Sequence, residues 1–122
     1  MILADTSVWI DHFRKRDAEL HRQLYLNNIS IHQFIVAELV LGNLPNRRKT
    51  IADLDLLPMV KVAQMEEVRS MIEAHSLFRR GIGLVDAHLI ASTLITPHTM
   101  FWSHDKSLRD VAEKLGIGAS LS

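Results

Sequence analysis

The stretch Ile2-Leu3-Ala4-Asp5-Thr6-Ser7-Val8-Trp9-Ile10 decides the fold class, because an apolar run ends at an acid and a second apolar run follows. Short apolar runs of this kind are typical of buried strands. Asp5 would then lie at the carboxyl edge of the first strand, where open α/β sheets bind ligands. An aspartate in this place can also cap the following helix, so its position alone leaves both interpretations open.

Further short apolar runs alternate along the chain with longer segments of helical period. We predict strands near residues 1–5, 29–32, 59–62 and 99–103. The predicted helices cover residues 17–26, 33–41, 47–56, 65–78, 84–94 and 106–115, and Gly116 is expected to cap the last one. Strands separated by helices require parallel crossovers. We therefore expect one domain, residues 1–122, with an α/β fold: a central parallel β-sheet of four to five strands, covered by helices on both faces.

Two further acids are predicted to lie on the apolar faces of helices. Glu38 is three residues after Ile35 and three before Leu41, so its side chain is expected to point at the core. Asp86 lies three residues before Leu89, in the first turn of its helix. Each has an ordinary alternative: Glu38 could pair with a buried base or reach solvent, and Asp86 could be held by the helix dipole.

The fourth acid, Asp105, lies between an apolar run and a predicted helix, where an N-cap role would explain it alone. The four acids together indicate more, because carboxylates gathered away from water repel one another unless a cation or a proton neutralises them. Carboxylate ligands without histidine or thiolate suit Mg²⁺ or Mn²⁺, which can polarise a phosphoryl oxygen and activate a bound water. We therefore predict a metal-dependent enzyme that acts on phosphates.

Composition and charge narrow the classes further. The chain has no cysteine, which excludes disulfides and thiolate metal sites. The 14 Lys+Arg balance 14 Asp+Glu, so net charge gives no argument for a polyanionic partner. The basic clusters at residues 14–16, 47–49 and 79–80 could bind nucleic acid or simply complement helix dipoles. We expect a cytoplasmic protein with no membrane association, because no secretory signal or long apolar segment is present.

The four acidic segments resemble the acidic motifs of PIN domains, and in particular those of VapC-type toxin ribonucleases of bacterial toxin–antitoxin pairs. The matching segments are residues 2–11 around Asp5, Ala37-Glu38-Leu39, residues 83–91 around Asp86, and Ser103-His104-Asp105. Their order and spacing and the chain length agree with the family, so the resemblance covers nearly the whole chain.

The resemblance implies a PIN-like fold and a Mg²⁺- or Mn²⁺-dependent endoribonuclease that cleaves an RNA substrate, with the four acids at the carboxyl end of the sheet. Asp5 and Asp86 would be the main metal ligands. Glu38 and Asp105 would bind metal through water, complete a second site or orient the attacking water. The family also implies a homodimer and a cognate antitoxin whose tail blocks the acidic groove.

Supporting residues follow from the same resemblance. Thr6 or Ser103 would hydrogen-bond the carboxylates. The last motif commonly begins with Thr and ends in an aromatic residue, whereas this chain has Ser103 and Leu108. His104 is either an exposed loop residue or a contact to phosphate or RNA. Trp9 lies in an apolar run, and we expect it to pack in the core, not to stack on bases.

Three alternatives are weighed against the nuclease. A phosphatase of the haloacid dehalogenase type has a second acid two residues after the first, where this chain has Ser7. A receiver domain has adjacent acids before its first helix, and no such pair occurs near Asp5. A non-catalytic PIN-like domain that binds RNA or protein is expected to have lost acids, and all four are present.

Overall fold

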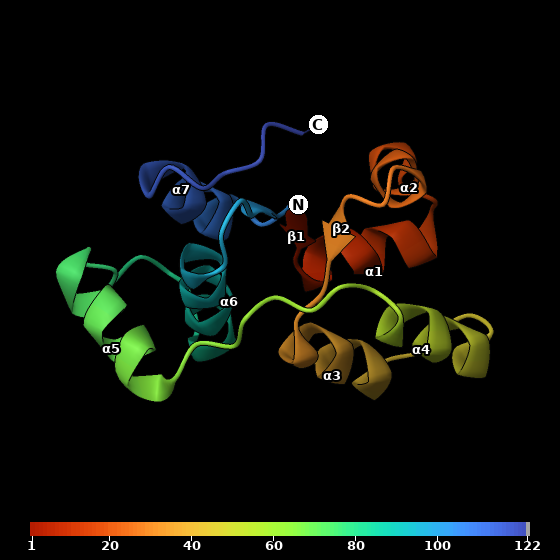
Figure 1. Cartoon of the computed structure of the whole chain (residues 1–122), viewed down its shortest axis with the longest axis horizontal. Coiled ribbons are helices and arrows are strands. Elements are labelled where there is room, and N and C mark those ends of the chain that lie inside the picture. The colour runs from red at the N-terminus through yellow and green to blue at the C-terminus, as the bar shows by residue number, and fades with distance from the viewer. Residues whose placement is uncertain (122) are drawn as a thin grey trace.

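The computed structural model describes residues 1–121 and contains a three-stranded parallel sheet (Figure 1). The strands are β1 (Ile2–Ala4), β2 (Ile29–Ser30) and β3 (Met100–Trp102), in the order β2-β1-β3. Helices cover both faces of the sheet, with α2 and α7 on one face and α3 and α6 on the other (Figure 1). This double cover explains why β1 and β3 are apolar at every position.

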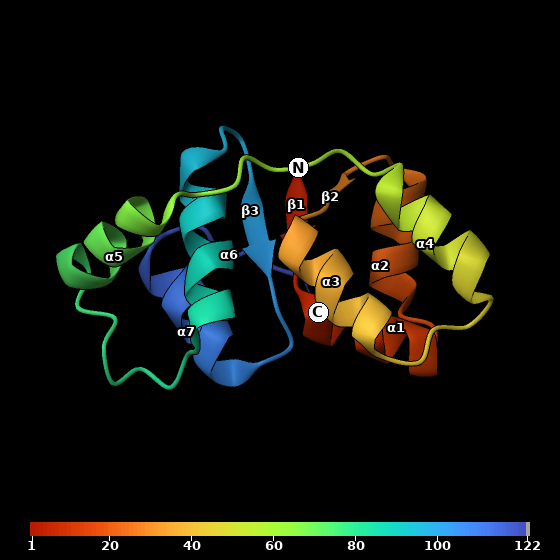
Figure 2. The same cartoon turned by 90° about the horizontal axis from the view of Figure 1, so that it is seen from below.

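Seven helices lie within residues 1–121: α1 (Thr6–Arg14), α2 (Ala18–Tyr25), α3 (Gln33–Leu41), α4 (Arg47–Asp55), α5 (Met65–Ala74), α6 (Leu84–Ile95) and α7 (Lys106–Lys114). In Figure 2, α5, α6 and α7 lie toward the β3 edge of the sheet, whereas α2 and α4 lie toward the β2 edge. The parallel strands lead into α1, α3 and α7, so the starts of these helices gather near one edge of the sheet. None of the helices in this described part has the length and hydropathy needed to cross a bilayer.

The α/β class and the parallel sheet are as predicted, but the expected four to five strands are not found in residues 1–121. The predicted strand near residues 59–62 is reduced to one parallel bridge between Ile31 and Met59. Beyond that bridge the backbone N–H of Lys61 donates to Thr96 Oγ1 at 3.0 Å. This N–H faces away from Ile31, and the ladder ends because the partner segment begins α3 at Gln33.

The outer edge of β3 is paired by the segment that follows α7. Phe101 N donates to Ile117 O at 2.7 Å, and Ala119 N donates to Phe101 O at 2.8 Å. These two bonds surround a single parallel bridge between Phe101 and Gly118. Glycine suits this place because a Cβ at residue 118 would lie 3.0 Å from the Glu113 side chain and 3.3 Å from its backbone nitrogen.

All six predicted helices are present, and Gly116 follows α7 with a φ of 75°, as predicted for a cap. Helix α5 ends at Ala74, four residues earlier than predicted. Helix α1 is not among the predicted helices, because the apolar run around Trp9 resembles a buried strand. Trp9 and Trp102 are buried in one hydrophobic core, which confirms the packing role predicted for Trp9.

Candidate active site

Asp5 lies at the carboxyl end of β1, as predicted, and is only 5% exposed. Its Oδ1 accepts hydrogen bonds from the Ser7 hydroxyl at 2.5 Å and the Ser7 N–H at 3.1 Å, and its Oδ2 accepts one from the Ser103 hydroxyl at 2.8 Å. Burial raises the pKa of Asp5, these donors counteract the rise, and the charge of Asp86 adds to it. Asp5 is also the N-cap of α1, so the capping interpretation is correct without excluding a site.

Asp86 lies in the first turn of α6, where its Oδ2 accepts a hydrogen bond from the Gly83 N–H at 3.3 Å. Burial raises the pKa of Asp86, and the negative charges of Asp105 and Glu38 raise it further. Asp86 in turn raises the pKa of Asp5. Asp86 therefore lies within electrostatic reach of the other three acids, and the structure brings together the four acids that the sequence indicated.

The prediction that Glu38 points at the core is wrong. Glu38 is exposed, and Leu41, which was expected to share its buried face, is 87% exposed. The buried face of α3 carries Ile35 and Leu39, four residues apart, and Glu38 lies beside that face. Glu38 Oε1 accepts a hydrogen bond from the Thr6 hydroxyl at 2.7 Å, so Thr6 supports Glu38 and not Asp5.

Asp105 is exposed and is the N-cap of α7, where its Oδ1 accepts a hydrogen bond from the Leu108 N–H at 3.0 Å. The N-cap interpretation of Asp105 is thus confirmed. Its own N–H donates to Ser103 Oγ at 3.0 Å, so the predicted hydroxyl of Ser103 contacts both Asp5 and the Asp105 backbone. The amino-terminal ends of α1, α6 and α7 all meet carboxylates here, and the helix dipoles favour these negative charges.

His104 is held between two carboxylates, an arrangement that neither sequence interpretation contains. Its Nδ1 lies 2.5 Å from Asp11 Oδ2, and its Nε2 lies 3.6 Å from Asp17 Oδ2. The backbone N–H of His104 donates to Ser7 Oγ at 3.0 Å. The sequence offers no signal for the pair with Asp11, because the two residues are 93 positions apart. Ser7 is also missing from the predicted site, although it follows Asp5 by two residues at a helix start.

A groove of about 570 Å³ begins beside Glu38 and runs between α1, α3 and the segment before α4. Its walls combine polar and apolar groups: Ile10, Phe13, Arg14, Glu38, Leu39, Gly42, Asn43, Leu44 and Pro45. Arg14, from the first basic cluster, is therefore close to the site. Arg47, from the second cluster, donates to the carbonyls of Val40 and Gly42 and so supports the end of α3.

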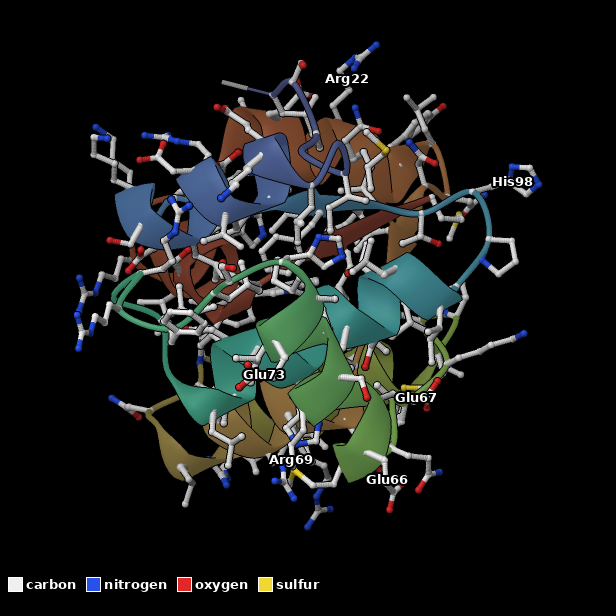
Figure 3. The ribbon with its side chains drawn as sticks, turned by 90° about the vertical axis from the view of Figure 1, so that its left-hand side faces the viewer. Arg22, Glu66, Glu67, Arg69, Glu73 and His98 are labelled. Atoms are coloured by element: carbon white, nitrogen blue, oxygen red, sulfur yellow. The ribbon has the colours of Figure 1, made fainter. Side chains whose placement is uncertain are left out.

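A larger and more open hollow, of about 670 Å³, follows the outer face of α5. Glu66, Arg69 and Glu73 lie along this helix (Figure 3), and every residue that lines the hollow comes from α5. None of the four acids lines it, so this hollow is a feature of the helix surface and not part of the acid site.

The donor chemistry of the acid site fits a hard divalent cation. Within residues 1–121, no group of three or more His, Asp or Glu side chains is arranged to hold a metal ion by itself. Mg²⁺ does not need such a group, because it is commonly bound by one or two carboxylates and keeps several waters. The raised pKa values of Asp5 and Asp86 mean that the protein alone disfavours both negative charges, and a cation would compensate them.

Comparison with known proteins agrees with this geometry. The PIN domain pattern matches residues 2–114, and the chain belongs to the PIN-domain family. Over 117 residues it is 34% identical to proteins named Ribonuclease VapC32 in two strains of Mycobacterium tuberculosis, a match that covers 96% of this chain and 94% of the relatives. The resemblance to VapC-type PIN ribonucleases is thereby confirmed. PIN ribonucleases generally depend on a divalent metal.

Proposed function

We propose that this chain is a Mg²⁺-dependent endoribonuclease, with Mn²⁺ as a substitute, and the toxin of a type II toxin–antitoxin pair. One observation carries the proposal: the pKa values of Asp5, at the carboxyl end of β1, and of Asp86 are both raised, and the charge of Asp86 contributes to the rise at Asp5. The family and the similarity to a named ribonuclease support RNA as the substrate. One nuclease domain, residues 1–122, performs the reaction in the cytoplasm.

In this proposal Asp5 and Asp86 bind the metal ion directly. Glu38 and Asp105 bind it through water, complete a second site or orient the attacking water. The ion, when bound, polarises a phosphoryl oxygen and lowers the pKa of a bound water. The hydroxyl of Ser103 fixes the Asp5 carboxylate, which keeps one of the four acids in place while RNA binds.

Two protein partners belong to the proposal. A cognate antitoxin blocks the acidic groove, and the apolar wall formed by Ile10 and Phe13 beside Glu38 gives its tail a surface to cover. A second copy of the chain completes a homodimer. Phe78 and Leu84, at 57% and 58% exposure, are large apolar side chains around the start of α6 that a dimer contact would remove from water.

The test is cleavage of a mixed cellular RNA pool by the purified protein with Mg²⁺ or Mn²⁺ and with EDTA. We expect discrete cuts that need the metal and that disappear in Asp5→Asn and Asp86→Asn. Asp53→Asn is the matched control, because Asp53 is an exposed aspartate that pairs with Lys49 on α4. This control should cleave like the wild type.

The remaining alternatives would give different results. A folded, inhibitor-free protein that binds RNA and cuts nothing under any metal would be a binding-only PIN domain. Metal-dependent release of phosphate from a phosphomonoester, without cuts in RNA, would indicate a phosphatase. Either result would overturn the nuclease proposal.

A further inference from the structure

Two serine hydroxyls connect the Asp5 carboxylate to the loop that carries Asp105. Ser7 donates to Oδ1 of Asp5 at 2.5 Å, and Ser103 donates to Oδ2 at 2.8 Å. The backbone N–H of His104 donates to Ser7 Oγ, and that of Asp105 donates to Ser103 Oγ, each at 3.0 Å. Each serine therefore accepts one N–H from the loop and gives its proton to Asp5.

The number of hydroxyl protons determines the direction of each hydrogen bond in this arrangement. A hydroxyl has one proton and two lone pairs, and an ionised carboxylate only accepts. Because both protons go to Asp5, the 3.4 Å contact between Ser7 Oγ and Ser103 Oγ has no proton to share. The lone pairs of the two hydroxyls are thus left free for the N–H groups of His104 and Asp105. An ionised Asp5 orients both serines toward the loop.

The bonds of the Ser7 hydroxyl join parts of the chain that are far apart in sequence. Capping of α1 requires only Asp5 Oδ1 and the backbone N–H of Ser7. The hydroxyl adds a bond to His104, 97 residues away, and so ties the start of α1 to the loop after β3. Asp11, one turn further along α1, holds the imidazole of the same His104. Helix α1 therefore contacts this loop at two positions, Ser7 and Asp11.

We propose that Ser7 is a positioning residue that sets the place of Asp105 relative to Asp5 and Asp86. The inference rests on the proposed metal-dependent cleavage. Ser7 touches neither metal nor RNA in this proposal, and it acts through the Asp5 carboxylate and the His104 backbone. Partners of this kind, one step behind the ligands, typically contribute 10- to 100-fold to metal affinity or activity.

The test compares Ser7→Ala with Ser7→Thr, which keeps the hydroxyl, and with Ser70→Ala, a serine-to-alanine change at an exposed position of α5. Binding of Mn²⁺ to metal-free protein is measured by calorimetry, and RNA cleavage is measured over a range of RNA concentrations. Ser7→Ala should lower Mn²⁺ affinity or kcat at least about tenfold and leave KM for RNA within about twofold. Ser7→Thr should recover most of that loss, and Ser70→Ala should match the wild type.

Amide hydrogen exchange gives a readout that is independent of activity. In Ser7→Ala the N–H of His104 loses its acceptor, so its exchange should become at least about tenfold faster relative to amides in β1. Should Ser7→Ala fail to fold, Ser7→Cys keeps a weak donor and acceptor and should show a smaller change in the same direction.

The outcomes separate this inference from the proposed function. A wild type that neither binds Mn²⁺ nor cuts RNA overturns both. A wild type that binds and cuts, with Ser7→Ala changed only in Tm, overturns the positioning role alone. Loss of Mn²⁺ affinity or kcat in Ser7→Ala, with recovery in Ser7→Thr, supports it.

Discussion

Two of the four acids, Glu38 and Asp86, lie on helices that also position a buried pair of histidines, and burial shifts the pKa values of Asp86 and His32 in opposite directions. Helix α3 carries Glu38 and starts directly after His32, while α6 carries both Asp86 and His88. Burial raises the pKa of Asp86. Burial, helped by the charge of His88, lowers the pKa of His32 to about 4. In both places the low-polarity surroundings favour the neutral form of the side chain.

The histidine site and the acid site differ in the partners that the protein supplies to their buried polar groups. His32 is fully buried, its Nδ1 accepts a hydrogen bond from the Phe34 N–H, and its Nε2 contacts Ser92 Oγ, both at 3.0 Å. Since Nδ1 accepts, the proton of the neutral ring is on Nε2 and is donated to Ser92. Neutral His32 is therefore satisfied by the protein itself, whereas the buried Nδ1 of His88 has no hydrogen-bond partner within residues 1–121. Burial raises the pKa values of Asp5 and Asp86, so in the proposed function the histidine site contributes to stability and the acid site binds a cation.

The largest expected effect breaks the acid site while sparing the histidines. Asp86→Asn should reduce kcat for RNA cleavage about a thousandfold, or about 4 kcal/mol in the barrier, because a charge that compensates the ion is lost. Its Tm without metal should not fall, because the substitution removes a charge that burial disfavours. The measurements are single-turnover cleavage and thermal unfolding. A large fall in Tm would show that Asp86 is mainly a structural residue.

The next largest effect is expected from a substitution that disrupts the histidine site and leaves the acid site unchanged. His32→Ala should lower the free energy of unfolding by about 2–3 kcal/mol, because the Phe34 N–H and Ser92 lose a partner and a buried ring is removed. Urea unfolding measures the loss. His75→Ala, an exposed histidine at the end of α5, is the control and should change stability little. Equal losses in both variants would contradict the special role of His32.

Acidification should change the stability contributed by His32 and the stability contributed by Asp86 in opposite directions. The pKa of His32 is about 4 in the folded state and 6.5 otherwise, so its stabilisation is lost as pH falls from 6.5 toward 4. This corresponds to at most roughly 2 kcal/mol between pH 7 and pH 5. The raised pKa of Asp86 works the other way, because the folded protein gains stability as that carboxylate is protonated.

The measurement is urea unfolding of metal-free protein between pH 7 and pH 4.5. His32→Asn should flatten the loss of stability on acidification, whereas Asp86→Asn should make it steeper than in the wild type. If the two variants shift the curve in the same direction, the opposite roles assigned to burial in the two places are incorrect.

The smallest expected effect is the stabilisation by added Mn²⁺, whose positive charge would compensate the carboxylates of the acid site. Mn²⁺ at ten times its dissociation constant should stabilise the wild type by about 1.4 kcal/mol, because the ion binds only the folded chain. Thermal unfolding with and without Mn²⁺ measures this. Asp5→Asn should lose the increment, and His32→Asn should keep it. An equal rise in Tm for Asp5→Asn would place the ion elsewhere on the chain.

The sequence predicted the acids better than their surroundings. Asp5 and Asp105 follow strands, so their places at the edge of the sheet could be inferred from the apolar runs before them. For Glu38 the choice of helix face failed, because α3 is apolar around most of its circumference and offers no clear polar side. Burial then depends on the neighbours of α3 in the fold, which a single helix pattern does not contain.

Most of the contacts that support the acids could not be predicted from the sequence, and the reason is different. Ser7 and His104 meet across 97 residues, and Asp11 and His104 across 93. Such contacts depend on how the strands bring distant segments together, and a single sequence holds no periodic signal for them. The segment near Met59 was overestimated as a strand for the same reason, since its apolar residues pair through only one bridge.

The pairing of Phe101 with the segment around Gly118 has a consequence for solubility. The PIN domain match ends at residue 114, and the segment that covers the outer edge of β3 lies beyond that point. A chain shortened to the family boundary would leave the N–H and C=O of Phe101 without partners on a hydrophobic strand. Uncovered strand edges of this kind are templates for intermolecular pairing. The few residues after α7 should therefore lower the tendency of this edge to aggregate, because they pair both backbone groups of Phe101.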